Sequence, residues 1–424
     1  MTPATAVPAA ALPLDRDTVE RFGAERGEPE WLRRGRLAAA ARFTPDLWPT
    51  GQEEEWRRFP PREIPASPLV GARSTVTHTR EGLPGGVFFG PLEAAVRERP
   101  DLVEARLGEG EGECEGLRTH AAFRAAAEAL WSTGTFLYVP AGVSIDVPLV
   151  AERVWAGGDE ALLSRTIVVA ERDSEVTFVE DTSSIGGGGR RSAIPLVDVH
   201  LGPGARVRTV LVQRLAEDVW DIGTQRYLSE RGSQLASFNV LVGSGRTKLG
   251  VGSDIVGDGA EVKMYGLVAA TGTQRIDVNS LQRLDGKASQ SDLLYLSALY
   301  GSAKAVYYGV IRVEPTSRGS GSYQECRNLL LSERAGAVPI PVLEILTNDV
   351  ARCGHGATAG RIDEEEVFYV MSRGIDRRTS EQLLVRGFFQ RVVDRIPDVG
   401  IRARVLEALR PRIGRAADLD LQAA

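Results

Sequence analysis

The alternation of apolar and polar residues divides the chain into three regions. Between about residue 135 and residue 345, short runs rich in β-branched residues follow one another with almost no helical period. On either side of this stretch, apolar residues recur at the three- and four-residue spacing of amphipathic helices. The pattern therefore predicts a mainly β core flanked by helical segments at both ends.

The middle region contains six clear strand signals. Each is a run of five to eight residues in which β-branched and other apolar side chains dominate. The runs cover residues 166–170, 175–180, 196–201, 207–213, 235–242 and 261–268.

A short motif repeats through the same region. A small residue, a variable residue and an apolar residue follow each polar turn, at intervals of about 28 residues. The motifs begin at Ser174, Ala205, Ser233, Ala260 and, more weakly, Ala288. A β unit of this length cannot bury its apolar face alone, so the repetition favours the stacked coils of a β-solenoid. A β-sandwich is the alternative, but about 210 residues of strands exceed the ~100 residues of one sandwich.

Helix signals flank the β region. Pro29, Asp363 and Asp376 mark helix starts, Gly374 marks a stop, and one apolar stripe consists of Leu384, Phe388, Val392 and Ile396. The expected helices cover Leu14 to Phe22, Pro29 to Phe43, Leu92 to Glu98, His120 to Trp131, a segment from Asp363 to Gly374, a segment from Asp376 to Pro397, and Ile401 to Leu409.

These signals predict four segments. They are a disordered tail (1–13), an N-terminal helical region with an irregular segment (14–133), a β-helix core (134–350), and a Cys-x-His loop followed by a C-terminal helical domain (351–424).

Composition narrows the function classes. The net charge is −6, which argues against a nucleic acid as the main partner. No apolar run is long enough to span a membrane, and the N-terminus lacks the basic residues of a secretory signal, so we expect a cytoplasmic protein. The three cysteines, Cys114, Cys326 and Cys353, are far apart in the sequence and cannot form a self-contained four-thiolate metal site.

Cys353 and His355 are the main candidates for chemistry. They flank Gly354 in a glycine-rich segment, where we expect a turn that brings both side chains to one point. A thiolate and an imidazole both suit iron or zinc, but they supply only two ligands. A buried cysteine beside a hydrogen-bonded histidine is the structural alternative.

Other signals point to structure more than to chemistry. The glycine-rich stretch 186–192 lacks the lysine of a phosphate-binding loop, and we expect a flexible loop there. Cys326 fits a small core residue in a strand. His78, His120 and His200 have no companion ligands, so we expect structural or surface roles.

Several stretches together resemble the SufB/SufD family of the SUF iron-sulfur cluster assembly system. The longest is CGHGATAGRIDEEEVFYVMSRGI at 353–375, and GTFLYVPAGVSIDVPL (134–149) and YQECRNLLLSERA (323–335) support it. The N-terminal part is more similar to SufD than to SufB. The stretch between Ile345 and Cys353 is one residue longer than the family pattern.

The resemblance implies a right-handed parallel β-helix between helical terminal regions. It also implies a heterodimer with a SufB-like paralogue and binding of SufC, an ABC-type ATPase, by the stretch from Phe368 to Phe389. His355 and Cys353 match the family's Cys-x-His motif and would be transient ligands of an iron-sulfur cluster at the subunit interface. ATP would act only through the partner, and whether a flavin binds is left open.

The function expected from the resemblance is that of a non-catalytic scaffold for cluster assembly and transfer. Two alternatives remain open at this point. One is a SufB-like homodimer that works without a dedicated partner. The other is a β-helical carbohydrate-active enzyme, which would use a pair of carboxylates that nothing in the sequence singles out.

Overall fold

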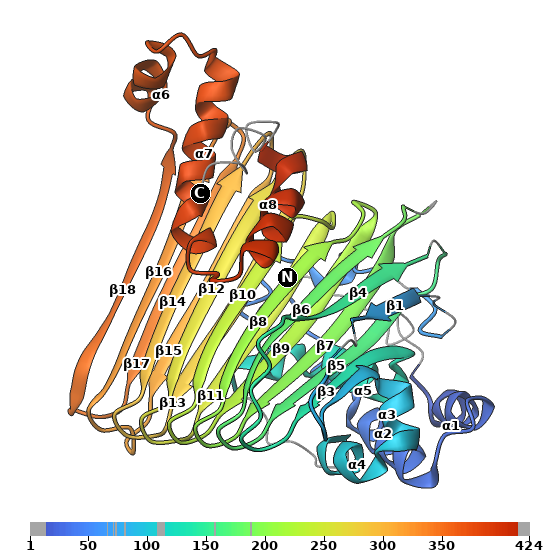
Figure 1. Ribbon diagram of the computed structural model, residues 1–424. Coiled ribbons are helices and arrows are strands. Elements are labelled where there is room, and N and C mark those ends of the chain that lie inside the picture. Colours follow the sequence, from blue (N-terminus) through green and yellow to red (C-terminus); the bar gives the residue numbers. More distant parts are fainter. Residues whose placement is uncertain are drawn as a thin grey trace.

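The computed structural model describes residues 14–413, except residues 66, 71, 73, 80–81, 108–114, 157 and 187–188. The described residues form two nine-stranded sheets, and helices cover part of the outer face of each sheet (Figure 1). The tail expected at 1–13, Cys114 and two glycines of the expected flexible loop lie outside the described residues.

The strands alternate between the two sheets along the chain. In spatial order, the first sheet consists of β1 (Ser74–His78), β4 (Leu149–Trp155), β6 (Glu175–Ser184), β8 (Arg206–Arg214), β10 (Gln234–Leu241), β12 (Glu261–Ala270), β14 (Gln290–Leu299), β16 (Ser320–Leu330) and β18 (Val350–Arg361). The second consists of β17 (Gly336–Ile345), β15 (Lys304–Val313), β13 (Arg275–Leu284), β11 (Arg246–Ile255), β9 (Val219–Ser229), β7 (Arg191–Leu201), β5 (Leu162–Ala170), β3 (Thr133–Val139) and β2 (Phe88–Pro91).

From β3 to β18 all neighbouring strands are parallel, so the described chain winds through eight coils, each with one strand in either sheet. The expected parallel β-solenoid is therefore confirmed. Only β1 and β2 pair antiparallel, with β4 and β3, at the N-terminal end of the stack. The sequence patterns did not predict these two strands, because β1 lies within the stretch from Phe59 to Gly90, which is rich in proline and glycine, and β2 lies at its end.

Helices precede and follow the solenoid, as expected. The N-terminal ones are α1 (Arg16–Glu25), α2 (Glu30–Arg42), α3 (Leu92–Glu98), α4 (Pro100–Leu107) and α5 (Ala121–Leu130), with short 3-10 helices η2 (Pro45–Leu47), η3 (Pro61–Glu63) and η4 (Glu115–His120). The C-terminal ones are α6 (Glu364–Met371), α7 (Arg377–Val393) and α8 (Val399–Ile413). No helix in the described part of the chain has the length and apolar character that crossing a membrane requires.

One backbone feature explains the sequence repeat. Before the small residue of each motif, the chain adopts a left-handed conformation that turns it into the next strand. The residues in this conformation are Asp173, Gly204, Gly232, Gly259, Ala288 and Gly319, with φ between 52° and 71°. Ala288 is therefore equivalent to Gly259, and Ser289 is equivalent to Ala260, since Gln290 pairs with Glu261. The motif predicted to begin at Ala288 begins one residue later.

The apolar residues occupy three layers. Inward-facing side chains from both sheets fill the space between them. The outer face of the first sheet packs on α7 and α8 through residues such as Phe238 and Phe389. The outer face of the second sheet packs on the N-terminal helices through residues such as Trp220 and Phe123. Both terminal regions therefore bury apolar stripes on the solenoid itself.

The stripe predicted for the helix after Asp376 is correct in its second half only. Val392 and Ile396 are fully buried as expected, although α7 ends at Val393 and Ile396 lies beyond it. Leu384 and Phe388 are only partly buried, and the neighbouring Val385 and Phe389 are buried in their place. Two adjacent apolar rows begin in the first half of α7, and sequence spacing alone does not show which of them faces the sheet.

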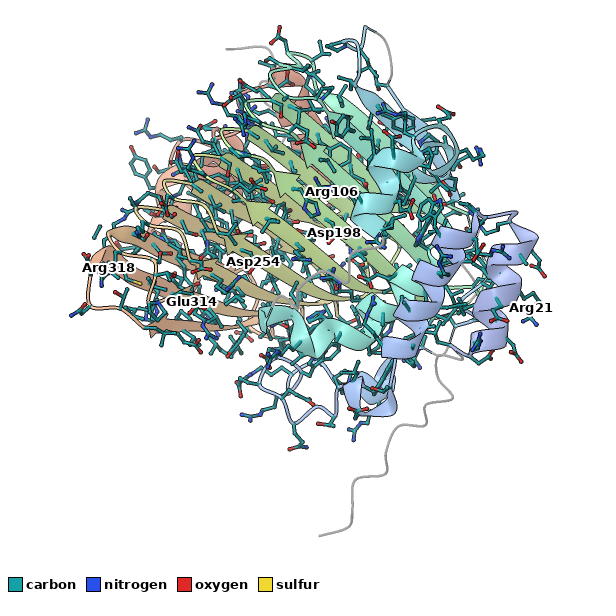
Figure 2. The ribbon with its side chains drawn as sticks, turned by 90° about the horizontal axis from the view of Figure 1, so that it is seen from below. Arg21, Arg106, Asp198, Asp254, Glu314 and Arg318 are labelled. Carbon is teal, nitrogen blue, oxygen red and sulfur yellow. The ribbon has the colours of Figure 1, made fainter. Side chains whose placement is uncertain are left out.

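A row of alternating charges runs across the outer face of the second sheet. Asp198, Arg226, Asp254 and Arg283 stand in register on β7, β9, β11 and β13. Figure 2 labels Asp198 and Asp254. Asp254 accepts a hydrogen bond from Arg283 at 2.9 Å and lies 3.7 Å from Arg226. Parallel stacking brings equivalent positions of successive coils together, so charged side chains tolerate burial here by pairing along the stack.

A reciprocal pair of substitutions tests the turn geometry. A Cβ on Gly259 would meet no atom within 4 Å, so the cost of Gly259→Ala comes only from the left-handed backbone. We expect this change to lower the free energy of unfolding by about 1 kcal/mol, and Ala288→Gly to raise it by about 0.5–1 kcal/mol. Urea denaturation measures both. If both substitutions changed the free energy of unfolding in the same direction, Gly259 and Ala288 would not be equivalent positions.

Candidate functional site

Cys353 and His355 lie on β18, the last strand of the first sheet, at the C-terminal end of the solenoid (Figure 1). The turn expected around them is therefore wrong, because residues 350–361 form one continuous parallel strand on β16. Two residues apart on a strand, the two side chains point to the same face and are separated by about 7 Å along the chain. They remain neighbours, but on an extended backbone.

The glycines around Cys353 and His355 suggested a turn, but in the structure they lie within a strand and make room for a neighbouring side chain. Gly354 and Gly356 face Tyr323 of β16, and a Cβ added to them would lie 3.5 Å and 3.0 Å from atoms of the Tyr323 side chain. Glycine in a strand often marks the close approach of a neighbouring group. The glycines of this segment thus accommodate a partly exposed aromatic ring, and they leave Cys353 and His355 on the opposite face.

The register shows which face this is. Cys353 stands opposite Ser322, and His355 stands opposite Gln324. Both β16 residues are at most 1% exposed and point into the space between the two sheets. Cys353 and His355 therefore point toward the interior side of the last coil, where no further coil of the described chain covers them.

A β-bulge precedes the pair. Val350 pairs with Ser320 and Arg352 pairs with Gly321, so Ala351 has no partner residue on β16. A bulge takes up one extra residue in a strand without changing the register beyond it. The additional residue noted between Ile345 and Cys353 is accommodated in this stretch, and Cys353 and His355 keep their interior orientation.

The two side chains differ in their surroundings. Cys353 is partly buried and packs against the interior core, while His355 is exposed. Burial raises the pKa of the Cys353 thiol, and a hydrogen bond from the Gly354 backbone opposes this shift. The thiol is therefore protonated near neutral pH, and a metal could bind it only if that proton were lost. With an accessible imidazole beside a shielded thiol, His355 is the more available of the two candidate ligands.

The described chain does not contain a complete metal site. Within the described residues, no group of three or more histidine, cysteine, aspartate or glutamate side chains is arranged to hold a metal ion. Iron in clusters usually has four ligands to each metal atom, including the bridging sulfides. Cys353 and His355 would thus need ligands from elsewhere.

Cys326 lies on the same interior face as the pair but deeper. It stands on β16 opposite Ala357 and is 1% exposed, so its assignment as a small core residue is consistent with the structure. Burial raises the pKa of its thiol to about 12, although Asn328 donates a hydrogen bond to Sγ at 3.5 Å. Its protonated, enclosed thiol is unsuited to binding a metal.

The remaining histidines are separate from this site. His120 is fully buried beneath the N-terminal region, and burial lowers its pKa to about 3. His78 lies on β1, 3.2 Å from the Thr135 hydroxyl. His200 lies on the outer face of β7, and burial lowers its pKa to about 4. None of them faces Cys353 or His355, so the structure brings together only two of the candidate residues.

The free edge of β18 is the feature that sequence patterns missed. On a parallel strand, the N–H and C=O groups of successive residues point to alternate sides. The Ile362 N–H donates to Leu330 of β16, so the odd-numbered residues, including Cys353, His355 and Ala357, direct their backbone groups away from β16. In the described chain no strand pairs with these groups.

The other free edge, on β17, differs. The N–H groups of Gly336 and Leu346 donate to residues 303 and 313 beside β15, so the odd positions again face outward. Two of these odd positions are Pro339 and Pro341, which have no N–H to donate. Of the two edges at this end of the solenoid, only β18 offers an unbroken row of donors and acceptors.

A second exposed surface lies on α6, at the start of the stretch expected to contact an ATPase. Phe368 is 72% exposed and Tyr369 is 62% exposed, and three glutamates occupy the first turn. Figure 1 shows α6 beyond the end of the sheet, where it follows β18 and packs against α7. Exposed aromatic residues on a short helix are typical of a contact surface.

Comparisons with known proteins identify the family of the chain. A family model described as SUF system FeS cluster assembly, SufBD core domain, matches residues 153–388, which is more than half of the chain. The chain is 29% identical over 335 residues to the iron-sulfur cluster assembly protein SufD of Bacillus subtilis. That match covers 77% of this chain and 74% of the relative.

Two further relatives carry the SufBD family name. The chain is 25% identical to one from Synechocystis and 26% identical to one from Staphylococcus epidermidis, in each case over 74% of its length. These matches cover 65% and 66% of the relatives, so the chain spans slightly less than two thirds of their length.

Thiol labelling tests the different burial of the two described cysteines. With Cys114 replaced by serine, we expect iodoacetamide to label Cys353 at least tenfold faster than Cys326 in the folded protein, because only Cys353 is partly exposed. The rate at Cys353 should still lag behind that of free cysteine at the same pH, since its pKa is raised. Mass spectrometry of tryptic peptides measures both rates. Equal rates would contradict the burial of Cys326.

Proposed function

The chain belongs to the SufBD family of the SUF iron-sulfur cluster assembly system, and on this basis we propose that it is a non-catalytic scaffold subunit of a cytoplasmic assembly complex. In this proposal a SufB-like paralogue joins it to complete the cluster site, and a SufC-like ABC ATPase hydrolyses ATP. The cluster is cargo that the complex builds and passes on. The family assignment favours this function over the carbohydrate-active enzyme that a β-solenoid alone would allow.

The observation that carries the proposal is the position of Cys353 and His355. They point toward the interior side of the last strand of the first sheet and lie directly on the free edge of β18. A strand that pairs with this edge would bring its own side chains next to theirs. Two ligands from this chain and further ligands from the partner would then meet at the interface, which resolves the incomplete ligand set.

Backbone chemistry supports docking at β18. An unpaired strand edge is a template for another strand, and natural proteins usually block such edges with proline or charge. Pro339 and Pro341 interrupt the edge of β17, whereas β18 contains no proline. The partner in our proposal therefore adds a strand to the first sheet, with main-chain hydrogen bonds supplying part of the affinity.

The ATPase in our proposal binds near α6. The expected contact stretch ran from Phe368 to Phe389, but Val385 and Phe389 are buried against the sheet. The exposed aromatic side chains of α6, Phe368 and Tyr369, remain available together with the acidic turn at 364–366. The surface offered to SufC is therefore α6 and the outward face of α7.

Replacement of His355 tests the ligand role. We expect His355→Ala to leave unfolding and complex formation unchanged, because the side chain is exposed, and to weaken cluster retention by about tenfold or more. The visible absorption of the anaerobically reconstituted complex measures cluster content per complex. Thr358→Ala, an exposed change on the opposite face of β18, is the matched control. Normal cluster content in His355→Ala would refute the assigned role.

Proline substitution tests the docking edge. Ala357→Pro removes an outward N–H and leaves the β16 pairing intact, so we expect the isolated chain to unfold at its normal temperature while binding the paralogue about tenfold or more weakly. Thr358→Pro removes an N–H directed at β16 and should destabilise the chain itself. Titration calorimetry and thermal unfolding measure the two effects.

Ala357→Pro also distinguishes a heterodimer with the paralogue from a homodimer of this chain. If the chain associates with itself through β18, Ala357→Pro should convert a dimer to a monomer in the absence of any paralogue. Undiminished association of Ala357→Pro with every partner would mean that β18 is not the docking edge.

A further inference from the structure

A cavity lies inside the solenoid, several coils away from β18. It has a volume of ≈ 60 Å³ and is lined by inward-facing residues of the coils from β5 to β11. Half of the residues that line it are leucine, valine, alanine or proline, and most of the others are polar. The only charged residues that line it are Glu180 and Asp221, and both are acidic.

Asp221 has an unusual environment for a buried carboxylate. It is 4% exposed, and its Oδ2 accepts a hydrogen bond from Gln213 Nε2 at 2.9 Å. Its Oδ1 has no hydrogen-bond partner. Gln213 cannot supply a second bond, because its Oε1 accepts from the Gly243 N–H and its other amide N–H points to Thr247. One carboxylate oxygen of Asp221 is thus left unsatisfied beside the cavity.

The other buried acidic residues all have basic partners. Six aspartates and glutamates are buried within the described residues, and five lie within 4.0 Å of a basic side chain. The pairs are Glu180 with Arg153, Asp181 with Arg214, Asp198 with Arg165, Asp254 with Arg283 and Asp277 with Lys248. Asp221 is the exception in the described chain.

The charges around the cavity therefore do not balance. Glu180 is paired with Arg153, which leaves the charge of Asp221 without a basic partner beside the cavity. Burial raises the pKa of Asp221 to about 6, because desolvation disfavours the charged form and the hydrogen bond from Gln213 only partly opposes this shift. A buried charge of this kind is normally paired with a counter-ion.

We propose that the cavity binds a small monovalent cation, of the class of sodium, potassium or ammonium, with Asp221 as its carboxylate ligand. Carboxylate, amide and hydroxyl oxygens are the donors that hard cations prefer, and Ser164, Thr182 and Asn239 also line the cavity. The volume is enough for an ion and a water molecule, since a water takes up about 30 Å³. A single uncompensated charge matches a monovalent ion better than a divalent one.

The site is independent of the proposed cluster site. It lies between β5 and β11, whereas Cys353 and His355 lie on β18. A bound ion would neutralise the inner coils and add to the stability of the solenoid. The inference can therefore be tested on the isolated full-length chain, without iron, sulfide or a partner.

Cation-dependent unfolding provides the test. We expect the unfolding midpoint to be about 2–4 °C higher in sodium, potassium or ammonium chloride than in choline chloride at the same ionic strength and pH, because choline is too large to enter. In Asp221→Asn this difference should disappear. The variant should also be more stable than the original chain in choline chloride, since it no longer buries an unpaired charge.

Asp254→Asn is the matched control, because Asp254 is equally buried but paired with Arg283 and Arg226. It should lower the midpoint in every salt and keep the difference between cations. Crystals soaked in rubidium or thallium should show an anomalous peak in the cavity of the original chain and none in Asp221→Asn.

Two results would overturn the proposal. One is the same midpoint in all four salts, with a dependence on pH alone, which would mean that a proton neutralises Asp221 beside Glu180 and Arg153. The other is an absence of anomalous density at the cavity in the original chain. The crystallographic measurement on the original chain decides the question even if Asp221→Asn does not fold.

Discussion

Backbone hydrogen bonding between parallel coils is the constraint on which the rest of the structure depends. Each strand from β3 to β16 satisfies its N–H and C=O groups on two neighbours, so the stack is self-contained everywhere except at its ends. At the N-terminal end, the antiparallel strands β1 and β2 cap both sheets. At the C-terminal end no described strand does so, and β18 keeps an open row of donors and acceptors. The candidate cluster ligands lie on this strand.

The same stacking governs the charged and polar residues. Because equivalent positions of successive coils lie about 4.8 Å apart, side chains of opposite charge can pair along the stack, as Asp254 and Arg283 do. Inside the solenoid, polar side chains such as Gln225 and Asn239 pair in a similar way across the interior. Departures from this pairing are therefore informative. Asp221 has an unmatched charge, and Cys353 and His355 have an incomplete ligand set.

Sequence patterns predicted the fold well because successive coils of a solenoid repeat the same short pattern of residues at their turns. The spacing of small residues after turns reflects one backbone conformation, which recurs from Asp173 to Gly319. The motif placed at Ala288 was displaced by one residue because alanine there adopts a conformation that glycine usually supplies. The shape of the candidate site was harder to predict, since the glycines around His355 were interpreted as a turn. Their role in the structure depends on Tyr323, which lies on the preceding strand of the same sheet, and only the three-dimensional register reveals that contact.

The central claim is that the free edge of β18 is the surface on which a second subunit docks. Residue-resolved amide hydrogen exchange, measured on the isolated chain and on its complex with a SufB-like paralogue, tests this claim most directly. Our account predicts that the amides of Cys353, His355, Ala357 and Ala359 exchange rapidly in the isolated chain and become protected in the complex, while those of the even-numbered residues are protected in both. A stable complex in which these outward amides exchange as rapidly as before would contradict it.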